Sequence, residues 1–367
     1  MKNYLFLLLL FLQSFFGFSQ NTLQKFNNIQ TDFFIGKPIE HDKKLKDAIQ
    51  GNSYGFLISW NDLSSKDNLF NQLYNFPERG YSFLYQNFNS SILGEVYGGY
   101  RHFTYNLTPN KLYKLKLTSA FGLGYATKSY NAITNSLNFA HGSKLLVSAY
   151  LKLQYFKLLQ KNRLHLNAGI SLIHFSNISF KNPNLGLNTV ALNVGVNYKL
   201  NPVLISKNKK NHQLANINNA IQYNLVLRGG YNESLIIDSG LYPFYTLTFY
   251  GSKKINWYST LTGGIDFFNS KFLKNYIQTK NEELNENFNE NNYKRIGVFV
   301  GHELTQNNFA FISQLGYTIY YPYSYVSRIY ERFGFKYNLS SHWFSEVTMK
   351  VNLFRAEALE LGIGYKF

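Results

Sequence analysis

Residues 147–155 read VSAYLKLQY, and an apolar or aromatic residue stands at every second position of this stretch. The odd-numbered side chains from Val147 to Tyr155 would share one face of a β-strand, and the even-numbered ones from Ser148 to Gln154 would share the other. Strands that cross an outer membrane alternate in this way over about ten residues, because one face meets lipid and the other meets the lumen.

The same alternation recurs along the chain. It is clear in LELGIGYKF at 359–367 and is found near 54–61, 79–88, 94–105, 113–126, 163–176, 188–200, 219–232, 241–251, 255–268, 293–302, 308–319, 325–337 and 341–353. If a window near 30–38 and every later window are true strands, the count rises to 16. These windows predict an all-β protein: a transmembrane antiparallel outer-membrane β-barrel of about 14 strands, within a range of 12–16. We expect residues 20–367 to form this single barrel domain.

A secreted soluble β-sandwich would also alternate, but two features favour the barrel. The windows run to roughly 10–14 residues, whereas strands of globular sheets most often have about 5–6. The last strand ends in Phe367 with Tyr365 two positions before it. This ending resembles the C-terminal assembly signal of bacterial outer-membrane proteins, so the expected partners include the outer-membrane assembly machinery and the lipid bilayer.

The composition agrees with this class. Of the 367 residues, 45% are hydrophobic and only 16% are charged, against about 25% charged in an average soluble protein. The mean hydropathy is −0.24, and beyond the N-terminus no stretch approaches the roughly 18 apolar residues of a membrane-spanning helix. The absence of Cys excludes disulfides, thiolate metal sites and Cys nucleophiles.

The N-terminus has the pattern of a signal peptide. Lys2 precedes an apolar run at 4–12, and the small residues Gly17 and Ser19 stand at positions −3 and −1 of the expected cleavage site. We predict cleavage after Ser19, with residues 1–19 removed on export.

The charge balance suggests an anionic ligand. Lys and Arg number 37 against 20 Asp and Glu, which gives a net charge of +17, and no acid lies between Glu95 and Glu233. Lys128, Lys144 and Lys181 lie in or beside predicted external loops and are weak candidates for substrate binding. Export and the barrel argue against a nucleic-acid partner, and no spacing of residues suggests a metal or another cofactor.

One strand carries candidate catalytic groups. On 163–176 the alternation puts His174 and Ser176 on the outer face, and Asn188 falls on the same face of the next strand. Polar groups facing lipid are costly and indicate function. A Ser becomes a nucleophile when a His takes its proton and a third group orients that His. The plainer interpretation is an interfacial His hydrogen-bonded at a loop edge.

The segment IHFSN at 173–177, followed by NPNLGLN at 182–188, resembles the lipid A deacylase family of outer-membrane lipid A 3-O-deacylases, also called acyloxyacyl hydrolase-like. His41, GNSYG at 51–55, NFP at 75–77 and FGLGY at 121–125 resemble the larger, Bacteroidetes-type members. The resemblance covers about residues 30–200.

This resemblance implies an outer-membrane esterase that removes an ester-linked acyl chain from lipid A of lipopolysaccharide. Ser176 would be the nucleophile, His174 the general base, and Asn177 part of the oxyanion hole. The family's third member is Glu, but this chain has Asn188, which can orient a His without adding charge. The alternative is a non-catalytic barrel, a channel or a structural protein, that retains a degenerate deacylase motif. Hydrogen-bond reach between Ser176 and His174 on the outer face would favour the enzyme, and a lumen occupied by side chains would argue against a channel.

Overall fold

The computed structural model describes residues 27–63, 71, 74, 77–108, 113–160, 163–200, 220–285, 288–306, 308–353 and 355–367. The predicted signal peptide, residues 1–19, lies outside these ranges, so its cleavage stays a prediction.

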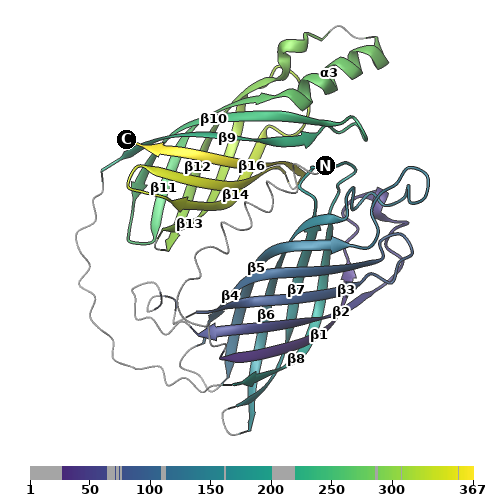
Figure 1. Ribbon diagram of the computed structural model, residues 1–367, viewed down its shortest axis with the longest axis vertical. Helices are drawn as coiled ribbons and strands as arrows, with labels where there is room; N and C mark the ends of the chain where they lie inside the picture. Colours follow the sequence, from purple (N-terminus) through teal and green to yellow (C-terminus); the bar gives the residue numbers. More distant parts are fainter. Residues whose placement is uncertain are drawn as a thin grey trace.

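The described strands form two closed antiparallel barrels of eight strands each. Figure 1 shows the first barrel, β1–β8, in the lower part of the molecule and the second barrel, β9–β16, above it. The prediction of one barrel with about 14 strands is therefore wrong. Each predicted window does coincide with a strand, and the error lies in how the strands close.

The first barrel consists of β1 (Asn28–Pro38), β2 (Ser53–Leu63), β3 (Glu78–Asn87), β4 (Glu95–Asn106), β5 (Lys114–Ala126), β6 (Leu145–Gln160), β7 (Leu164–Ser176) and β8 (Leu187–Lys199), with the short 3-10 helix η1 (Lys43–Leu45) after β1. The second consists of β9 (Gln222–Glu233), β10 (Leu241–Lys254), β11 (Ser259–Ser270), β12 (Lys294–Gln306), β13 (Phe309–Tyr320), β14 (Ile329–Asn338), β15 (Trp343–Asn352) and β16 (Arg355–Lys366). Between β11 and β12 lie α3 (Lys271–Leu284) and the 3-10 helix η2 (Glu290–Tyr293). None of the described helices is long and apolar enough to cross a membrane.

Closure happens twice because β8 returns to β1 and β16 returns to β9. Asn28 pairs with Lys199 at one end of the first seam, and Leu361 pairs with Gly229 in the second. The alternation of side chains identifies a strand and its two faces but does not specify which distant edge its backbone will meet. The stretch between β8 and β9, which has no strand pattern, is the connection between the barrels, and most of it lies outside the described residues.

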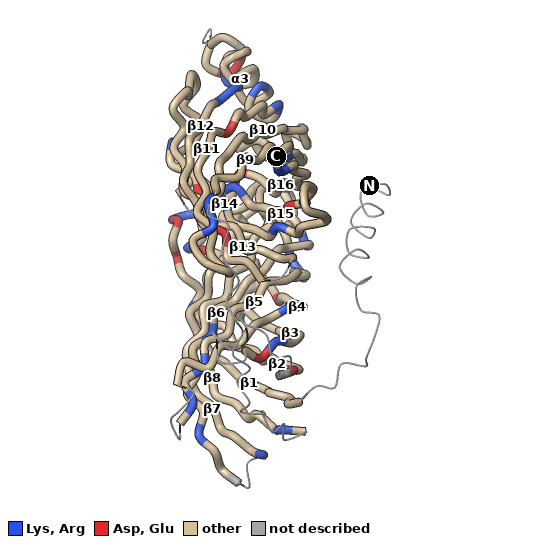
Figure 2. The backbone as a smooth tube through the Cα atoms, turned by 90° about the vertical axis from the view of Figure 1, so that its left-hand side faces the viewer, with Lys and Arg blue, Asp and Glu red and all other residues tan. Residues whose placement is uncertain are grey.

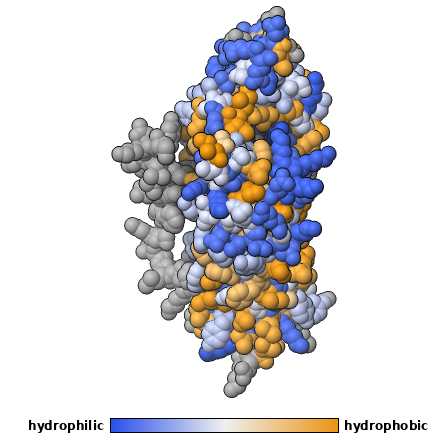
Figure 3. All heavy atoms as spheres, turned by 90° about the vertical axis from the view of Figure 1, so that its right-hand side faces the viewer, coloured by the Kyte–Doolittle hydropathy of each residue, from blue (hydrophilic) through white to orange (hydrophobic). Residues whose placement is uncertain are grey.

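The outer faces of the strands are apolar. On β8, Leu192 and Val194 are 66% and 61% exposed, whereas Asn193 between them is 3% exposed. Hydrophobic side chains cover much of the first barrel in Figure 3. This is the pattern of strands that face lipid outward and a polar lumen inward. From β5 to β8 the chain carries Lys and Arg but no Asp or Glu, as Figure 2 shows.

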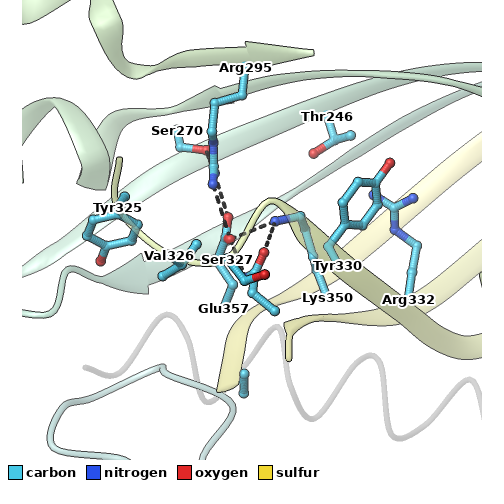
Figure 4. A network of polar contacts seen from close by, with 12 residues as sticks. Thr246, Ser270, Arg295, Tyr325, Val326, Ser327, Tyr330, Arg332, Lys350 and Glu357 are labelled. Carbon is cyan, nitrogen blue, oxygen red and sulfur yellow. Dashed lines mark hydrogen bonds and ion pairs between the residues drawn. The ribbon is translucent and has the colours of Figure 1, made fainter. Parts of the chain in front are cut away.

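Both lumens are filled by side chains, as expected for barrels of eight strands. In the first barrel, Lys152 Nζ lies 2.5 Å from Asp32 Oδ2 and both are buried. The second lumen has a denser set of ion pairs. Figure 4 shows part of it, where Arg295 and Lys350 each lie 2.6 Å from a carboxylate oxygen of Glu357.

A hydrophobic cluster closes the first barrel at the end where β7 finishes and β8 begins. Phe88, Leu93, Phe175 and Leu187 are all at most 1% exposed in this cluster. We call this end the site end. Because Phe175 points into the cluster, its neighbours His174 and Ser176 point the other way, onto the outer face.

Candidate functional site

The β7–β8 pair brings the first two candidate residues together. His174 and Asn188 are direct partners in the antiparallel register. Their side chains meet on the outer face, where His174 Nδ1 donates to Asn188 Oδ1 at 2.8 Å. With the proton on Nδ1, the lone pair of the ring lies on Nε2. The alternation in the sequence predicted this shared face correctly.

Ser176 lies on the same face, but its hydroxyl bonds to a different residue. The Asn184 amide Nδ2 donates to Ser176 Oγ at 2.9 Å, and the backbone N–H of Ile178 donates to the same oxygen at 3.1 Å. Ser176 Oγ also lies 3.3 Å from Asn184 Oδ1, to which it can donate. No hydrogen bond joins Ser176 to His174 among the described residues.

A glycine lets the two side chains approach. Gly186 has φ +70°, and a Cβ built on it would lie 3.3 Å from His174 Cε1 and 3.5 Å from Ser176 Cβ. His174 and Ser176 therefore border the same small space, with the Gly186 backbone against it. A side chain at this position would be strained and would fill that space.

Asn177 has both of its donor groups engaged. Its backbone N–H donates to Asn184 Oδ1 at 2.9 Å, and its Nδ2 donates to the backbone oxygen of Lys181 at 2.6 Å. Asn177 thus shapes the turn after β7 and holds Asn184 in place. The sequence motif contains Asn184, but no role was predicted for it from the sequence; its signal was the Asn-Pro-Asn run at 182–184, which ends eight residues after Ser176.

The three candidate lysines differ in their surroundings. Lys181 Nζ lies 3.5 Å from Asp238 Oδ1 of the second barrel, and both groups are exposed. Lys128 Nζ donates to the backbone oxygen of Ser91 at 2.5 Å. Lys144 is exposed and directly precedes β6. The structure therefore ties two of the three to other groups and leaves their role in substrate binding a proposal.

A second imidazole lies close to the site. His141, in the loop between β5 and β6, is fully buried, and its ring lies 6.3 Å from that of Phe88. Burial, and next the positive charge that His174 can carry, lower the pKa of His141 to about 3. His141 is therefore neutral at physiological pH and adds no fixed charge beside His174.

The turn that carries Asn184 is held by the second barrel. Asn182 N–H donates to Glu233 Oε2 at 2.5 Å, and Asn182 Nδ2 donates to the backbone oxygen of Ser234 at 2.6 Å. Ser179 Oγ donates to the backbone oxygen of Ala356 at 2.5 Å. These contacts join residues far apart in the sequence, and no motif in it pointed to them.

No three His, Asp or Glu side chains gather as metal ligands in the part of the chain that the structure describes. The candidate site thus consists of Ser176, His174, Asn188, Asn177 and Asn184, all on or between β7 and β8.

Two closed antiparallel β-barrels with apolar outer faces and lumens filled by polar side chains define a transmembrane β-barrel protein. The family model described as lipid A 3-O-deacylase (PagL) matches residues 54–197, within the first barrel. The model described as acyloxyacyl hydrolase, C-terminal domain, matches residues 221–367, the whole second barrel. The chain belongs to this lipid A deacylase family, as a larger member with two barrels, and it is an outer-membrane protein.

Several solved structures resemble the chain. The outer-membrane enzyme PagL is 16% identical and has a TM-score of 0.34, over 45% of this chain and 97% of that one. A deletion mutant of the monoaromatic hydrocarbon channel TodX is 9% identical with a TM-score of 0.19, over 94% and 91% of the two chains. CdiB from Acinetobacter baumannii is 10% identical with a TM-score of 0.19, over 95% and 60%. No curated protein matches the chain.

Proposed function

We propose that this protein is an outer-membrane esterase that removes an ester-linked acyl chain from lipid A, with Ser176 as nucleophile and His174 as general base. The observation that carries the proposal is the 2.8 Å bond from His174 Nδ1 to Asn188 Oδ1. Two of the three groups of a hydrolytic triad are thereby joined, and Ser176 stands beside them. Family membership supports the substrate class.

The paired groups specify where the proton goes. Because Asn188 Oδ1 accepts the Nδ1 hydrogen, Nε2 of His174 is free to take a proton from Ser176 Oγ. For this, the hydroxyl turns from Asn184 toward His174, across the space that Gly186 leaves open. Catalytic hydrogen bonds are often long or absent before substrate binds. Ser176 Oγ then attacks the ester carbonyl, and His174 returns the proton to the leaving alcohol. Water, deprotonated by His174, then attacks the acyl-enzyme, which releases the fatty acid and restores the Ser176 hydroxyl.

The developing oxyanion needs hydrogen-bond donors near Ser176. Asn184 Nδ2 already donates to Ser176 Oγ at 2.9 Å and has a second hydrogen to offer. The backbone N–H of Asn177 is held on the same Asn184 side chain. We therefore assign oxyanion stabilisation to the Asn184 amide, and we assign to Asn177, expected from the sequence to be an oxyanion donor, the role of holding Asn184 in place.

The position of the site suits a substrate that is itself a membrane lipid. Leu172 on β7 and Val190 on β8 are 41% and 49% exposed on the same face, one alternation step from His174 and Asn188. An acyl chain could lie along this apolar wall and present its ester to Ser176. Such a site is reached from the bilayer and not through the lumen.

The channel alternative is disfavoured by the lumens. Arg228 and Arg332 of the second barrel and Ser148 and Gln86 of the first are fully buried inside the barrels. Their side chains occupy space that a conducting pore would leave to water. If the protein is instead a structural barrel with a degenerate motif, lipid A should be unchanged by it.

The direct test is mass spectrometry of lipid A incubated with the purified protein and of lipid A from cells with and without it. We expect loss of the mass of one acyl chain and release of the matching hydroxy fatty acid or fatty acid. Unchanged lipid A in both experiments would exclude the proposed activity.

Replacing Asn188 with Glu is expected to raise the deacylation rate. A carboxylate that accepts from His174 Nδ1, as Asn188 Oδ1 does at 2.8 Å, would keep the same tautomer and stabilise the imidazolium as Ser176 is deprotonated. Loss of a correctly placed acid from a hydrolase triad costs up to roughly ten-thousandfold in rate, so we expect a gain of about tenfold or more below that ceiling. The measurement is single-turnover release of fatty acid across pH.

Asn188→Ala is the matched control for this gain. It removes the acceptor from His174 and should lower the rate. Equal rates for wild type, Asn188→Glu and Asn188→Ala would show that Asn188 does not orient the base.

Glu233→Ala is expected to slow deacylation although Glu233 lies in the other barrel. It removes the acceptor for the Asn182 N–H, so the turn with Asn184 would be less ordered. We expect a fall in kcat of roughly tenfold, the order of one lost charge-assisted hydrogen bond, with KM less affected. Glu233→Gln keeps an acceptor and should recover most of the rate.

Asp238→Asn serves as the control for Glu233, since it breaks only the exposed pair with Lys181. Exposed pairs contribute little. If Glu233→Ala and Asp238→Asn both leave kcat at the wild-type value, the second barrel does not position the turn.

A further inference from the structure

A pocket opens where the two barrels meet at the site end. It is lined by Lys44, Phe139 and Asn184 from the first barrel and by Leu235, Ile237 and Arg355 from the second. Next to the pocket, Ser179 and Asn182 of the first barrel form hydrogen bonds with the second barrel, and these bonds hold the two sides of the pocket together.

The pocket has the character of an anion site with apolar walls. Lys44 and Arg355 are its charged groups, and no Asp or Glu lines it. Both side chains are exposed, and Lys44 Nζ lies 5.4 Å from the centroid of the Phe139 ring. The Arg355 guanidinium makes no hydrogen bond or ion pair with any other residue that the structure describes. Leu235 and Ile237 supply apolar surface beside it.

The acids nearest in sequence to this pocket are engaged elsewhere. Glu233 accepts from Asn182 N–H, and Asp238, next to Ile237, lies 3.5 Å from Lys181 Nζ. Glu357 is paired with Arg295 and Lys350 in the lumen. Asp42 caps η1 by accepting from the backbone N–H of Lys44. The two cations of the pocket are thus available to a ligand.

Asn184 connects this pocket to the nucleophile. Asn184 lines the pocket, and its side-chain Nδ2 donates to Ser176 Oγ at 2.9 Å. A ligand held between Lys44 and Arg355 would therefore lie next to the reacting hydroxyl. Its acyl chains could extend from there onto the apolar wall of β7 and β8.

We propose that the pocket binds the phosphate group of a phosphorylated glycolipid headgroup, so that the second barrel forms part of the substrate site. The inference rests on the proposed deacylase function. Arg presents a planar set of donors that suits phosphate, and Lys44 adds a second charge. The apolar side chains around them would pack against the sugar and the first carbons of the chains.

The test compares lipid A with the same lipid after enzymatic removal of its phosphates, using the full-length protein in mixed micelles. The variants are Arg355→Gln, Lys44→Gln and the double variant. For phosphorylated lipid A we expect the double variant to raise KM by roughly 10- to 100-fold, the order of one or two lost charge-assisted bonds. For the dephosphorylated lipid, wild type and double variant should agree within about twofold.

Two further variants guard the interpretation. Arg355→Lys keeps the charge and should retain most of the affinity, and Lys157→Gln removes an exposed cation at the opposite end of β6 and should change nothing. Equal effects of the double variant on both lipids would overturn the proposal. A second result would also overturn the proposal: inorganic phosphate inhibits wild type but not the double variant, while KM is the same for the two lipids. The pocket would then bind free phosphate only.

A binding measurement separates this inference from the proposed activity. Ser176→Ala, with and without the Arg355 and Lys44 substitutions, is titrated with vesicles that contain phosphorylated or dephosphorylated lipid A. Weaker binding of only the phosphorylated lipid by the substituted protein supports the pocket even if wild type releases no fatty acid. Active wild type with no such difference in binding or KM rejects the pocket and leaves the deacylase intact.

Discussion

Ser176→Ala and His174→Ala should each reduce deacylation by at least about a thousandfold while both barrels remain folded. Removing a nucleophile or its base from a hydrolytic triad costs up to about a millionfold in kcat, and the remainder comes from the oxyanion site and binding. Both side chains lie on the outer face of β7 at the site end, away from the lumen, so the strand pairing should survive their loss. Fatty-acid release from lipid A in micelles measures the rate.

The strand itself provides the controls. His165 and Ser171 lie on β7 with the opposite parity and point to the lumen. His165→Ala and Ser171→Ala should keep activity near that of wild type, which tests the assignment of faces as well as of residues. Heat-modifiable migration on gels reports whether each barrel is folded.

The double variant adds a second check. Groups that act as one unit are not additive, so Ser176→Ala/His174→Ala should be about as slow as either single variant. Wild-type rates in a folded Ser176→Ala protein would refute the nucleophile, and a double variant that is far slower than both would mean that the two residues act independently.

Among substitutions that remove one partner of a lumenal ion pair in the second barrel, Arg332→Met should lower the stability of the fold most. Arg332 is fully buried and lies 2.9 Å from Asp266 Oδ2 and 2.6 Å from Glu360 Oε2. Its loss would leave two buried carboxylates without their principal cation. Breaking a buried ion pair by removing one partner typically costs about 3–5 kcal/mol.

The measurement is urea unfolding in micelles, followed by a probe in the second barrel such as the fluorescence of Trp343 or Trp257. Arg332→Met should shift the midpoint to lower urea, and Lys280→Met, which breaks the exposed pair with Glu283 on α3, should leave it unchanged. An unchanged midpoint for Arg332→Met would mean that the lumenal network does not hold the barrel together.

The same variant also tests the dependence of the site on the second barrel. If the turn that carries Asn184 needs the contacts at Glu233 and Ala356, deacylation should be lost at the urea concentration that unfolds the second barrel. Activity that persists beyond that point would show that the first barrel works alone.

The alternation in the sequence was sufficient to locate the strands and assign their faces. Each apolar-polar window became a strand, and the parity of 163–176 correctly placed Asn167 and Ser171 inside and His174 outside. It also placed Asn188 opposite His174, as the register confirms. Side chains of a strand alternate strictly, so lipid on one side and a polar lumen on the other impose a pattern that each strand shows by itself.

The number of barrels was decided by tertiary structure alone. Closure depends on hydrogen bonds between backbone groups of β1 and β8, and of β9 and β16, which every strand offers equally at its edge. Nothing in the side chains of β8 says that it pairs with a strand about 160 residues earlier instead of with β9. The prediction of one large barrel failed for that reason.

Some features of the candidate site likewise followed from the sequence, and others were decided only by the tertiary structure. His174, Ser176 and Asn188 follow from positions on two adjacent strands, so sequence spacing alone could place them on one face. The bond from Asn184 to Ser176, the support of its turn by Glu233, and the cationic pocket with Arg355 depend on how a loop folds back and on how two barrels meet. Such contacts join residues with no fixed spacing, and only the packing of the folded chain determines them.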